Sequence, residues 1–175
     1  LFVALPGAKT DGARFIQEAL EKGAAAVLCE TPPEGEGPWL AIPDARRALA
    51  LVSANWFGHP ARELTLVGVT GTNGKTTTTC LIKDLLERVL GTKAGLIGTI
   101  ENQIGSLRLP AHRTTPESYE VQQLLRQMAD AGCTHVVMEV SSHALVQHRV
   151  EGLPFAAGVF TTLTQDPLDY HHTME

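Results

Sequence analysis

Residues 68–76 have the composition of a phosphate-binding loop, with the sequence Gly-Val-Thr-Gly-Thr-Asn-Gly-Lys-Thr. They lie between an apolar, β-branched run at 64–70 and a segment of helical periodicity that begins at Lys75. Glycines allow a tight turn to point its backbone N–H groups at an anion, and the N-terminus of the following helix adds its dipole. The Lys75 ammonium would neutralise the β- and γ-phosphates of a nucleotide, and the Thr76 hydroxyl would bind Mg²⁺.

The loop is a variant of the usual spacing, which places a glycine at the position occupied by Val69. Gly68 and Gly71 lie on either side of that position. A glycine-rich turn without a ligand is the alternative, but a strand, a loop, a Gly-Lys-Thr sequence and an amphipathic helix coincide here. We therefore predict that a nucleotide is bound by Gly71, Thr72, Asn73, Gly74, Lys75, Thr76 and Thr77.

A loop of this kind needs a second, acidic residue that helps to organise the metal at the end of a neighbouring strand. Glu139 fits this requirement because it directly follows the apolar run at 135–138. In open α/β sheets, ligands bind beyond the carboxyl ends of the strands. The alternative is a glutamate that merely ends a strand at the surface. We predict that Glu139 and Thr76 hold the metal.

Alternating strands and helices must position these residues. Short apolar runs predict strands over residues 1–5, 25–29, 39–42, 64–70, 94–100, 135–140 and 155–161. Those at 1–5, 64–70, 135–140 and 155–161 are expected to be buried. Helical spacing predicts helices over residues 13–22, 44–57, 75–90 and 115–131. Asp44 is expected to cap the second of these helices, and Pro116 to occupy the first position of the fourth. A polar hairpin is expected over residues 101–109, with its turn at Gly105.

Strands that alternate with helices of this length indicate βαβ units, so the predicted fold class is α/β. A Gly-His-Pro break at residues 58–60 divides the chain in two. Residues 1–62 are expected to form a small α/β domain, and residues 63–175 a P-loop mononucleotide-binding domain with a mainly parallel sheet. Both domains are expected to be incomplete, because the chain begins inside an apolar run without Met and ends at Glu175 without a closing signal.

Composition and charge argue against several classes of protein. The 175 residues include 14 Lys and Arg against 19 Asp and Glu, a net charge of −5, which argues against a nucleic-acid or anionic-membrane binder. No apolar run approaches the roughly 18–20 residues of a membrane span. Three widely spaced cysteines make neither a disulfide framework nor a metal cluster, and we expect all three to be buried, reduced thiols of a cytoplasmic protein.

Four motifs, in this order along the chain, resemble those of the Mur ligases. They are the loop that ends in Gly-Lys-Thr, Arg-Thr-Thr-Pro at 113–116, Glu-Val-Ser-Ser-His-Ala-Leu at 139–145 and Leu-Thr-Gln-Asp at 163–166. Residues 1–12 also resemble the UDP-binding domain of that bacterial family. Within the family, the motifs are most similar to those of the member that adds the third residue to UDP-N-acetylmuramoyl-alanyl-glutamate in peptidoglycan synthesis.

The resemblance implies ATP-dependent amide-bond synthesis with Mg²⁺, through an acyl phosphate that an incoming amine then attacks. Its implied partners are UDP-N-acetylmuramoyl-dipeptide and a diamino acid, taken as meso-diaminopimelate because that is the commonest in the family, without an obligate protein partner. Lys75 and Glu139 are the implied catalytic residues. The implied substrate-binding residues are Thr114, Thr115, Ser141, Gln147 and Arg149. By residue type alone, Thr115 could be only a helix cap and Arg149 only a surface charge.

The end of the sequence departs from the family pattern. Thr162 replaces an Asn, His172 replaces a Gly, and Pro167 replaces a His that helps to hold a second Mg²⁺, which puts that site in doubt. The family's carbamylated lysine and its C-terminal domain would lie beyond Glu175, so we expect the chain alone not to catalyse ligation. A non-catalytic nucleotide- or UDP-sugar-binding module, a degenerate paralogue and another ligase such as folylpolyglutamate synthetase are the alternatives.

Overall fold

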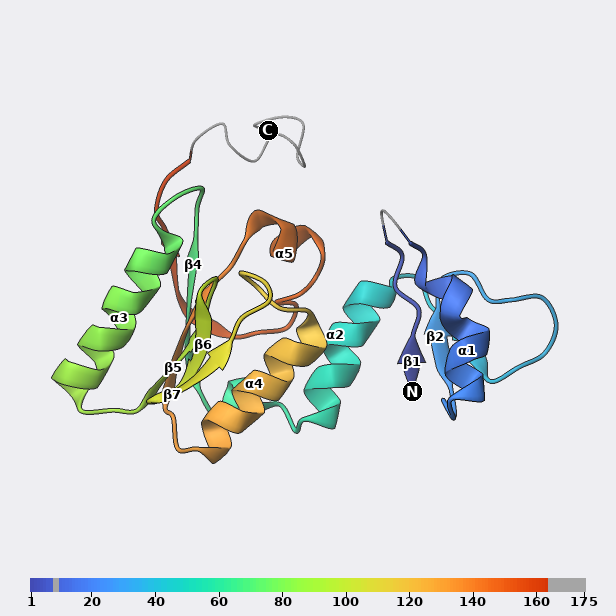
Figure 1. Cartoon of the computed structure of the whole chain (residues 1–175), viewed down its shortest axis with the longest axis horizontal. Helices are drawn as coiled ribbons and strands as arrows, with labels where there is room; N and C mark the ends of the chain where they lie inside the picture. Colours follow the sequence, from blue (N-terminus) through green and yellow to red (C-terminus); the bar gives the residue numbers. More distant parts are fainter. Residues whose placement is uncertain (8–9, 164–175) are drawn as a thin grey trace.

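The N-terminal part of the chain contains a small parallel sheet. In the computed structural model, which describes residues 1–7 and 10–163, strands β1 (Phe2–Val3), β2 (Val27–Cys29) and β3 (Trp39–Ala41) pair in that order. A 3₁₀ turn over Gly12–Phe15 leads into helix α1 (Ile16–Glu21), which covers this sheet (Figure 1). Buried side chains between α1 and the sheet form a local core of Ala4, Ile16, Val27 and Cys29.

The second sheet is larger and mainly parallel, as predicted. Its strand order is β7-β6-β5-β8-β4-β9, and β5, β8, β4 and β9 run parallel to one another. The hairpin of β6 and β7 adds an antiparallel edge. The bounds of these strands are β4 Thr65–Thr70, β5 Ala94–Ile97, β6 Glu101–Ile104, β7 Leu107–Pro110, β8 His135–Glu139 and β9 Phe155–Phe160.

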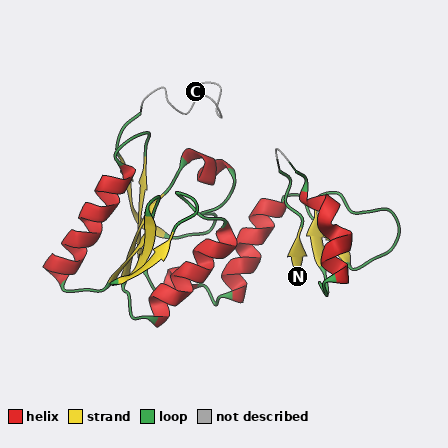
Figure 2. Ribbon diagram, in the orientation of Figure 1, coloured by secondary structure: helices red, strands yellow, loops and turns green. Residues whose placement is uncertain are grey.

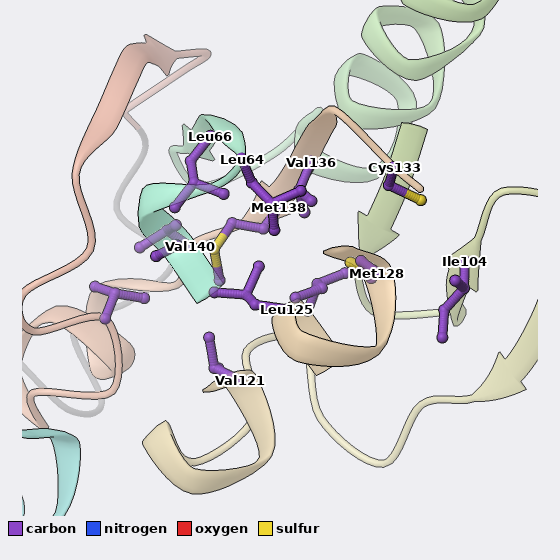
Figure 3. Close-up of a cluster of buried hydrophobic side chains, with 13 residues drawn as sticks. Leu64, Leu66, Ile104, Val121, Leu125, Met128, Cys133, Val136, Met138 and Val140 are labelled. Atoms are coloured by element: carbon purple, nitrogen blue, oxygen red, sulfur yellow. The ribbon is translucent and has the colours of Figure 1, made fainter. Parts of the chain in front are cut away.

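Helices cover both faces of this sheet (Figure 2). Helix α3 (Lys75–Leu90) packs on one face, where Val69, Leu96 and Val137 are buried. Helix α4 (Ser118–Asp130) packs on the other face through Val121, Leu125 and Met128 (Figure 3). Successive side chains of β8 point alternately into the two cores, as expected of a strand that is buried on both faces.

Helix α2 (Ala45–Trp56) joins the two parts of the structure. Its N-cap is Asp44, whose side chain accepts a hydrogen bond from the Arg47 N–H, as the sequence predicted. The helix packs against α4, and just beyond its end the rings of Phe57 and Tyr119 lie 5.3 Å apart. The first part of the chain is therefore held against the larger sheet through α2.

Several predicted boundaries change in the structure. The fourth predicted helix starts at Ser118 and not at Pro116, because Glu117 and Glu120 form a reciprocal capping box there. Strand β5 ends at Ile97, since Gly98 and Thr99 turn toward Glu139. The short helix α5 (Ser142–Val146) follows β8. Among the described residues no helix is long and apolar enough to span a membrane.

Three predictions of burial were wrong: for strand β1, of which neither residue is buried, for strand β9 and for Cys80. Strand β9 is mostly exposed, because among the described strands it pairs only with β4 and lies at the edge of the sheet. Cys29 and Cys133 are buried as expected, but Cys80 is exposed on the outer face of α3. The helical pattern of the sequence did not reveal that Cys80 lies on the exposed side of α3, away from the apolar residues that face the sheet.

The difference among the cysteines predicts their reactivity. Burial raises the pKa of the Cys29 and Cys133 thiols above the usual value, and the thiolate is the reactive form. We expect iodoacetamide to label Cys80 in the folded protein, while Cys29 and Cys133 react only after unfolding. Peptide mass spectrometry after a timed reaction, with and without guanidinium chloride, measures this. Labelling of Cys133 as fast as that of Cys80 in the native protein would contradict the packing of α4 on the sheet.

Candidate functional site

The glycine-rich loop connects β4 to α3 at the carboxyl edge of the larger sheet. Gly71 has φ +127° and Gly74 has φ +87°, conformations that favour glycine. A Cβ atom on Gly71 would lie 2.3 Å from Thr161 Oγ1, so this glycine also permits close packing against the segment after β9. Gly74 precedes the first turn of α3, whose leading N–H groups have no partner within the helix.

Thr161 and Thr162 hold the loop from the other side. The Thr161 hydroxyl lies 2.6 Å from the Asn73 carbonyl oxygen. The Thr72 N–H donates to the Thr162 carbonyl oxygen at 2.8 Å, and the Asn73 N–H donates to the Thr162 hydroxyl at 3.1 Å. The backbone N–H groups of two predicted phosphate-binding residues are thus directed toward Thr162. The sequence departure at position 162 therefore lies in direct contact with the loop.

The Lys75 side chain folds back over the loop. Its ammonium donates to the Gly71 carbonyl oxygen at 2.7 Å and to the Thr72 carbonyl oxygen at 3.0 Å. Within the described part of the chain Lys75 makes no ion pair with a carboxylate, so its charge has only these neutral partners. A phosphate placed against the loop would offer this ammonium a stronger, charge-assisted interaction.

Glu139 lies at the end of β8, where it pairs with Val69 near the end of β4, and it is 1% exposed. Its Oε2 accepts hydrogen bonds from the Thr76 and Thr99 hydroxyls, each at 3.0 Å, and its Oε1 accepts one from the Thr99 N–H at 2.9 Å. No cationic side chain in the described residues pairs with this carboxylate. Buried charged groups are normally paired with an opposite charge or coordinate a metal. A bound cation would be such a partner for the Glu139 carboxylate.

The oxygen atoms at this point suit Mg²⁺. A carboxylate oxygen and a hydroxyl oxygen 3.0 Å apart, from Glu139 and Thr76, are hard ligands of the kind that this ion takes. In the described ranges, no three His, Cys, Asp or Glu side chains gather into a metal-binding group. This sparse protein donor set fits an ion whose remaining ligands are waters and nucleotide phosphates, which is the usual arrangement for Mg²⁺.

Three of the predicted substrate-binding residues, Thr114, Thr115 and Ser141, lie near Glu139, but their side chains are used in different ways. Thr115 is buried, and its hydroxyl donates to the Glu139 carbonyl oxygen at 2.8 Å and accepts from the Ser141 N–H at 3.0 Å. It is not the cap of α4, since that position belongs to Glu117. The Ser141 hydroxyl caps α5 by accepting from the Ala144 N–H, and Thr114 contacts the Thr99 hydroxyl at 3.1 Å.

Arg149 is not a solvated surface charge, because its side chain is only 13% exposed. It donates to the Thr115 carbonyl oxygen at 2.8 Å and to Gln147 Oε1 at 2.6 Å. It also pairs with Glu117 at 3.0 Å, a carboxylate that Arg46 and Arg113 share. Burial lowers the pKa of Arg149, with Glu117 opposing that effect. Three guanidinium groups from separate segments thus surround one carboxylate.

A pocket of about 340 Å³ brings part of the predicted nucleotide-binding loop next to one predicted substrate-binding residue, Ser141. Lys75 lines it from the loop and Ser141 from the start of α5. The complete lining is Thr70, Gly71, Thr72, Lys75, Ser141, Ser142, His143, Phe160 and Leu163. A ligand in this pocket would contact the phosphate loop and the segment after Glu139 at the same time.

Thr99 and Thr161 were not among the predicted site residues, and Thr162 was noted only as a departure from the family pattern. Thr99 lies two residues beyond the end of β5, which pairs with β8, but the strand predicted over 94–100 included it, so the rule that ligands lie beyond strand ends did not point to it. Thr161 follows β9 and was likewise included in the strand predicted over 155–161. The expected effect of Pro167 on a second metal, and the position of His172, lie outside the described residues.

Comparisons with known proteins identify relatives of this chain. Residues 69–175 match the Mur ligase middle domain, and residues 1–56 match the Mur ligase family, catalytic domain. UDP-N-acetylmuramoyl-L-alanyl-D-glutamate--2,6-diaminopimelate ligases from Chlorobaculum tepidum and Clostridium tetani are 52% and 47% identical over 178 and 180 residues. Each alignment covers 100% of this chain but only 35% and 37% of the relative, so the chain spans about a third of their length.

Two solved structures are also similar. A UDP-N-acetylmuramoyl-L-alanyl-D-glutamate--2,6-diaminopimelate ligase superposes with a TM-score of 0.81 and 32% identity, over 97% of this chain and 34% of that one. A MurF ligase from Thermotoga maritima in complex with ADP has the same fold, with a TM-score of 0.64 and 24% identity, over 97% of this chain and 36% of that one. Because the middle-domain match alone covers more than half of the chain, the protein belongs to the Mur ligase family.

Proposed function

We propose that this chain carries the ATP-binding and UDP-muramoyl-binding parts of a ligase that adds a diamino acid, meso-diaminopimelate, to UDP-N-acetylmuramoyl-L-alanyl-D-glutamate. The observation that carries the proposal is the shared pocket, in which the Lys75 loop faces the Ser141 segment beside the buried Glu139. The substrates are those in the names of the relatives that align with the whole chain. In this proposal, residues 1–62 bind the UDP-sugar and residues 63–175 bind ATP.

The proposed reaction depends mainly on positioning and charge neutralisation. A carboxylate oxygen of the dipeptide attacks the γ-phosphorus of ATP, and the bond to the β-phosphate oxygen breaks to release ADP. The amine of the diamino acid then attacks the acyl carbon, forms the amide, loses a proton and expels phosphate. When bound, Mg²⁺ supplies positive charge at the phosphates, and Thr76 and Glu139 are the residues that would hold it.

The other residues of the site bind and orient. Lys75 exchanges its two carbonyl partners for phosphate oxygens, and the first N–H groups of α3 donate to the same anion. The arginine group formed by Arg46, Arg113 and Arg149 has more positive charge than Glu117 balances. Such an excess suits a ligand with a diphosphate and carboxylates. Arg46 comes from α2, so both parts of the chain contribute to this second subsite.

Replacing Lys75 tests nucleotide binding. We expect Lys75→Ala to weaken the affinity for MgATP about 10-fold or more, because a charge-assisted contact to phosphate is lost. Isothermal titration calorimetry on the 175-residue chain measures the change. Lys22→Ala is the matched control, since Lys22 is exposed and pairs with Glu18 on the surface of α1. Unchanged affinity in Lys75→Ala would rule out the phosphate-loop assignment.

Replacing Arg149 tests the second subsite separately. We expect Arg149→Ala to weaken binding of UDP-N-acetylmuramoyl-L-alanyl-D-glutamate about 10-fold or more while MgATP affinity changes little. Arg149→Lys should recover only part of the loss, because lysine keeps the charge but not the forked geometry. Arg88→Ala, on the exposed face of α3, is the control. If both ligands lose affinity equally, the assignment of Arg149 to a separate subsite is wrong.

A further inference from the structure

The turn after β5 holds the buried carboxylate more completely than Thr76 does. Thr99 contacts both oxygen atoms of Glu139, through its backbone N–H to Oε1 and through its hydroxyl to Oε2. Thr76 contacts only Oε2. One residue on a neighbouring strand end therefore determines how the carboxylate group is oriented.

The two oxygen atoms of Glu139 differ in how firmly their partners are fixed. Oε1 faces a backbone N–H, which cannot turn away unless the end of β5 moves. Oε2 faces two hydroxyl groups, from Thr76 and Thr99, and hydroxyl hydrogens rotate to suit their partners. Oε2 is consequently the atom that can accept a cation while the carboxylate stays in place.

The absence of a side chain at Gly98 leaves room for the Glu139 carboxylate. A Cβ atom at this position would lie 2.6 Å from Glu139 Oε1, closer than real contacts allow. The Gly98 N–H donates to Asn102 Oδ1 at 3.3 Å, and Asn102 is itself buried in the β6–β7 hairpin. The turn formed by Gly98 and Thr99, which binds Glu139, is thus hydrogen-bonded to the antiparallel edge of the sheet.

We propose that Thr99 is the positioning residue of the metal site, which fixes Glu139 so that Oε2 faces the Mg²⁺ of the bound nucleotide. This inference rests on the proposed function. When Thr76 turns to the ion, Thr99 keeps the carboxylate aligned. The Thr99 hydroxyl also lies 3.1 Å from the Thr114 hydroxyl, which links the proposed muramoyl-binding residue to the Glu139 carboxylate.

The test compares nucleotide affinity with and without Mg²⁺. Thr99→Val removes the hydroxyl and keeps the shape and the backbone N–H, and Thr99 is exposed, so the variant should fold. We expect its MgATP affinity to fall about 10-fold, the usual cost of losing an outer partner of a metal ligand. ATP affinity in EDTA should not change, and Thr99→Ser should restore MgATP binding. Thr65→Val, at the opposite end of β4 and also exposed, is the control.

Gly98→Ala provides a second, independent variant. The new methyl group would displace Glu139 Oε1 and not the backbone, since Gly98 does not have a positive φ. The same selective loss of the Mg²⁺-dependent part of the affinity is expected, with a melting temperature that shows that the protein is folded. Calorimetric titrations with ATP in Mg²⁺ or in EDTA measure both variants.

The outcomes separate this inference from the proposed function. If Lys75→Ala weakens nucleotide binding but Thr99→Val and Gly98→Ala bind MgATP like the unaltered chain, the positioning role is wrong and the proposed function stands. If the variants lose affinity equally in Mg²⁺ and in EDTA, Thr99 has a merely structural role and the inference is also wrong. If Lys75→Ala has no effect, the proposed function fails and this inference fails with it.

Discussion

The site depends on one buried carboxylate that has no positive partner among the described residues. Glu139 is 1% exposed and is held by neutral donors from the first turn of α3 and from the turn after β5. Burying a charge in this way is costly unless hydrogen bonds and a counter-charge compensate. The three hydrogen bonds supply the first compensation. The cation that we propose to be bound with the nucleotide would supply the second.

The parallel sheet is what brings the participants together. β4 ends at the glycine loop, β5 at Gly98 and Thr99, and β8 at Glu139, and these three strands are neighbours. Because parallel strands all end at one edge, three segments far apart in the sequence meet there. The cores on the two faces fix the strands in register. Arg46 of α2 reaches Glu117 beside Arg149, so the packing of α2 on α4 also positions part of the proposed second subsite.

The sequence predicted the features that depend on local pattern. The bounds of α3, the cap at Asp44, the hairpin over 101–109 and the place of Glu139 at a strand end all follow from periodicity, turn residues and capping chemistry. The features that it missed depend on tertiary contacts. Nothing local distinguishes the hydroxyl of Thr99 from that of any other threonine, and Thr115, expected at the substrate, has its hydroxyl turned inward to the backbone around Glu139. The exposure of β9 and Cys80 likewise depends on which neighbours the elements have.

The central claim is that Glu139 and Thr76 share a cation with a nucleotide bound at the Lys75 loop. A crystal structure of the chain with a non-hydrolysable ATP analogue and Mn²⁺, located by its anomalous scattering, tests this most directly. The account predicts the ion between Thr76 Oγ1 and Glu139 Oε2, Thr99 still bonded to the carboxylate, and the Lys75 ammonium moved from the Gly71 carbonyl to a phosphate. An ion held away from Glu139, with Lys75 still on the loop carbonyls, would contradict it.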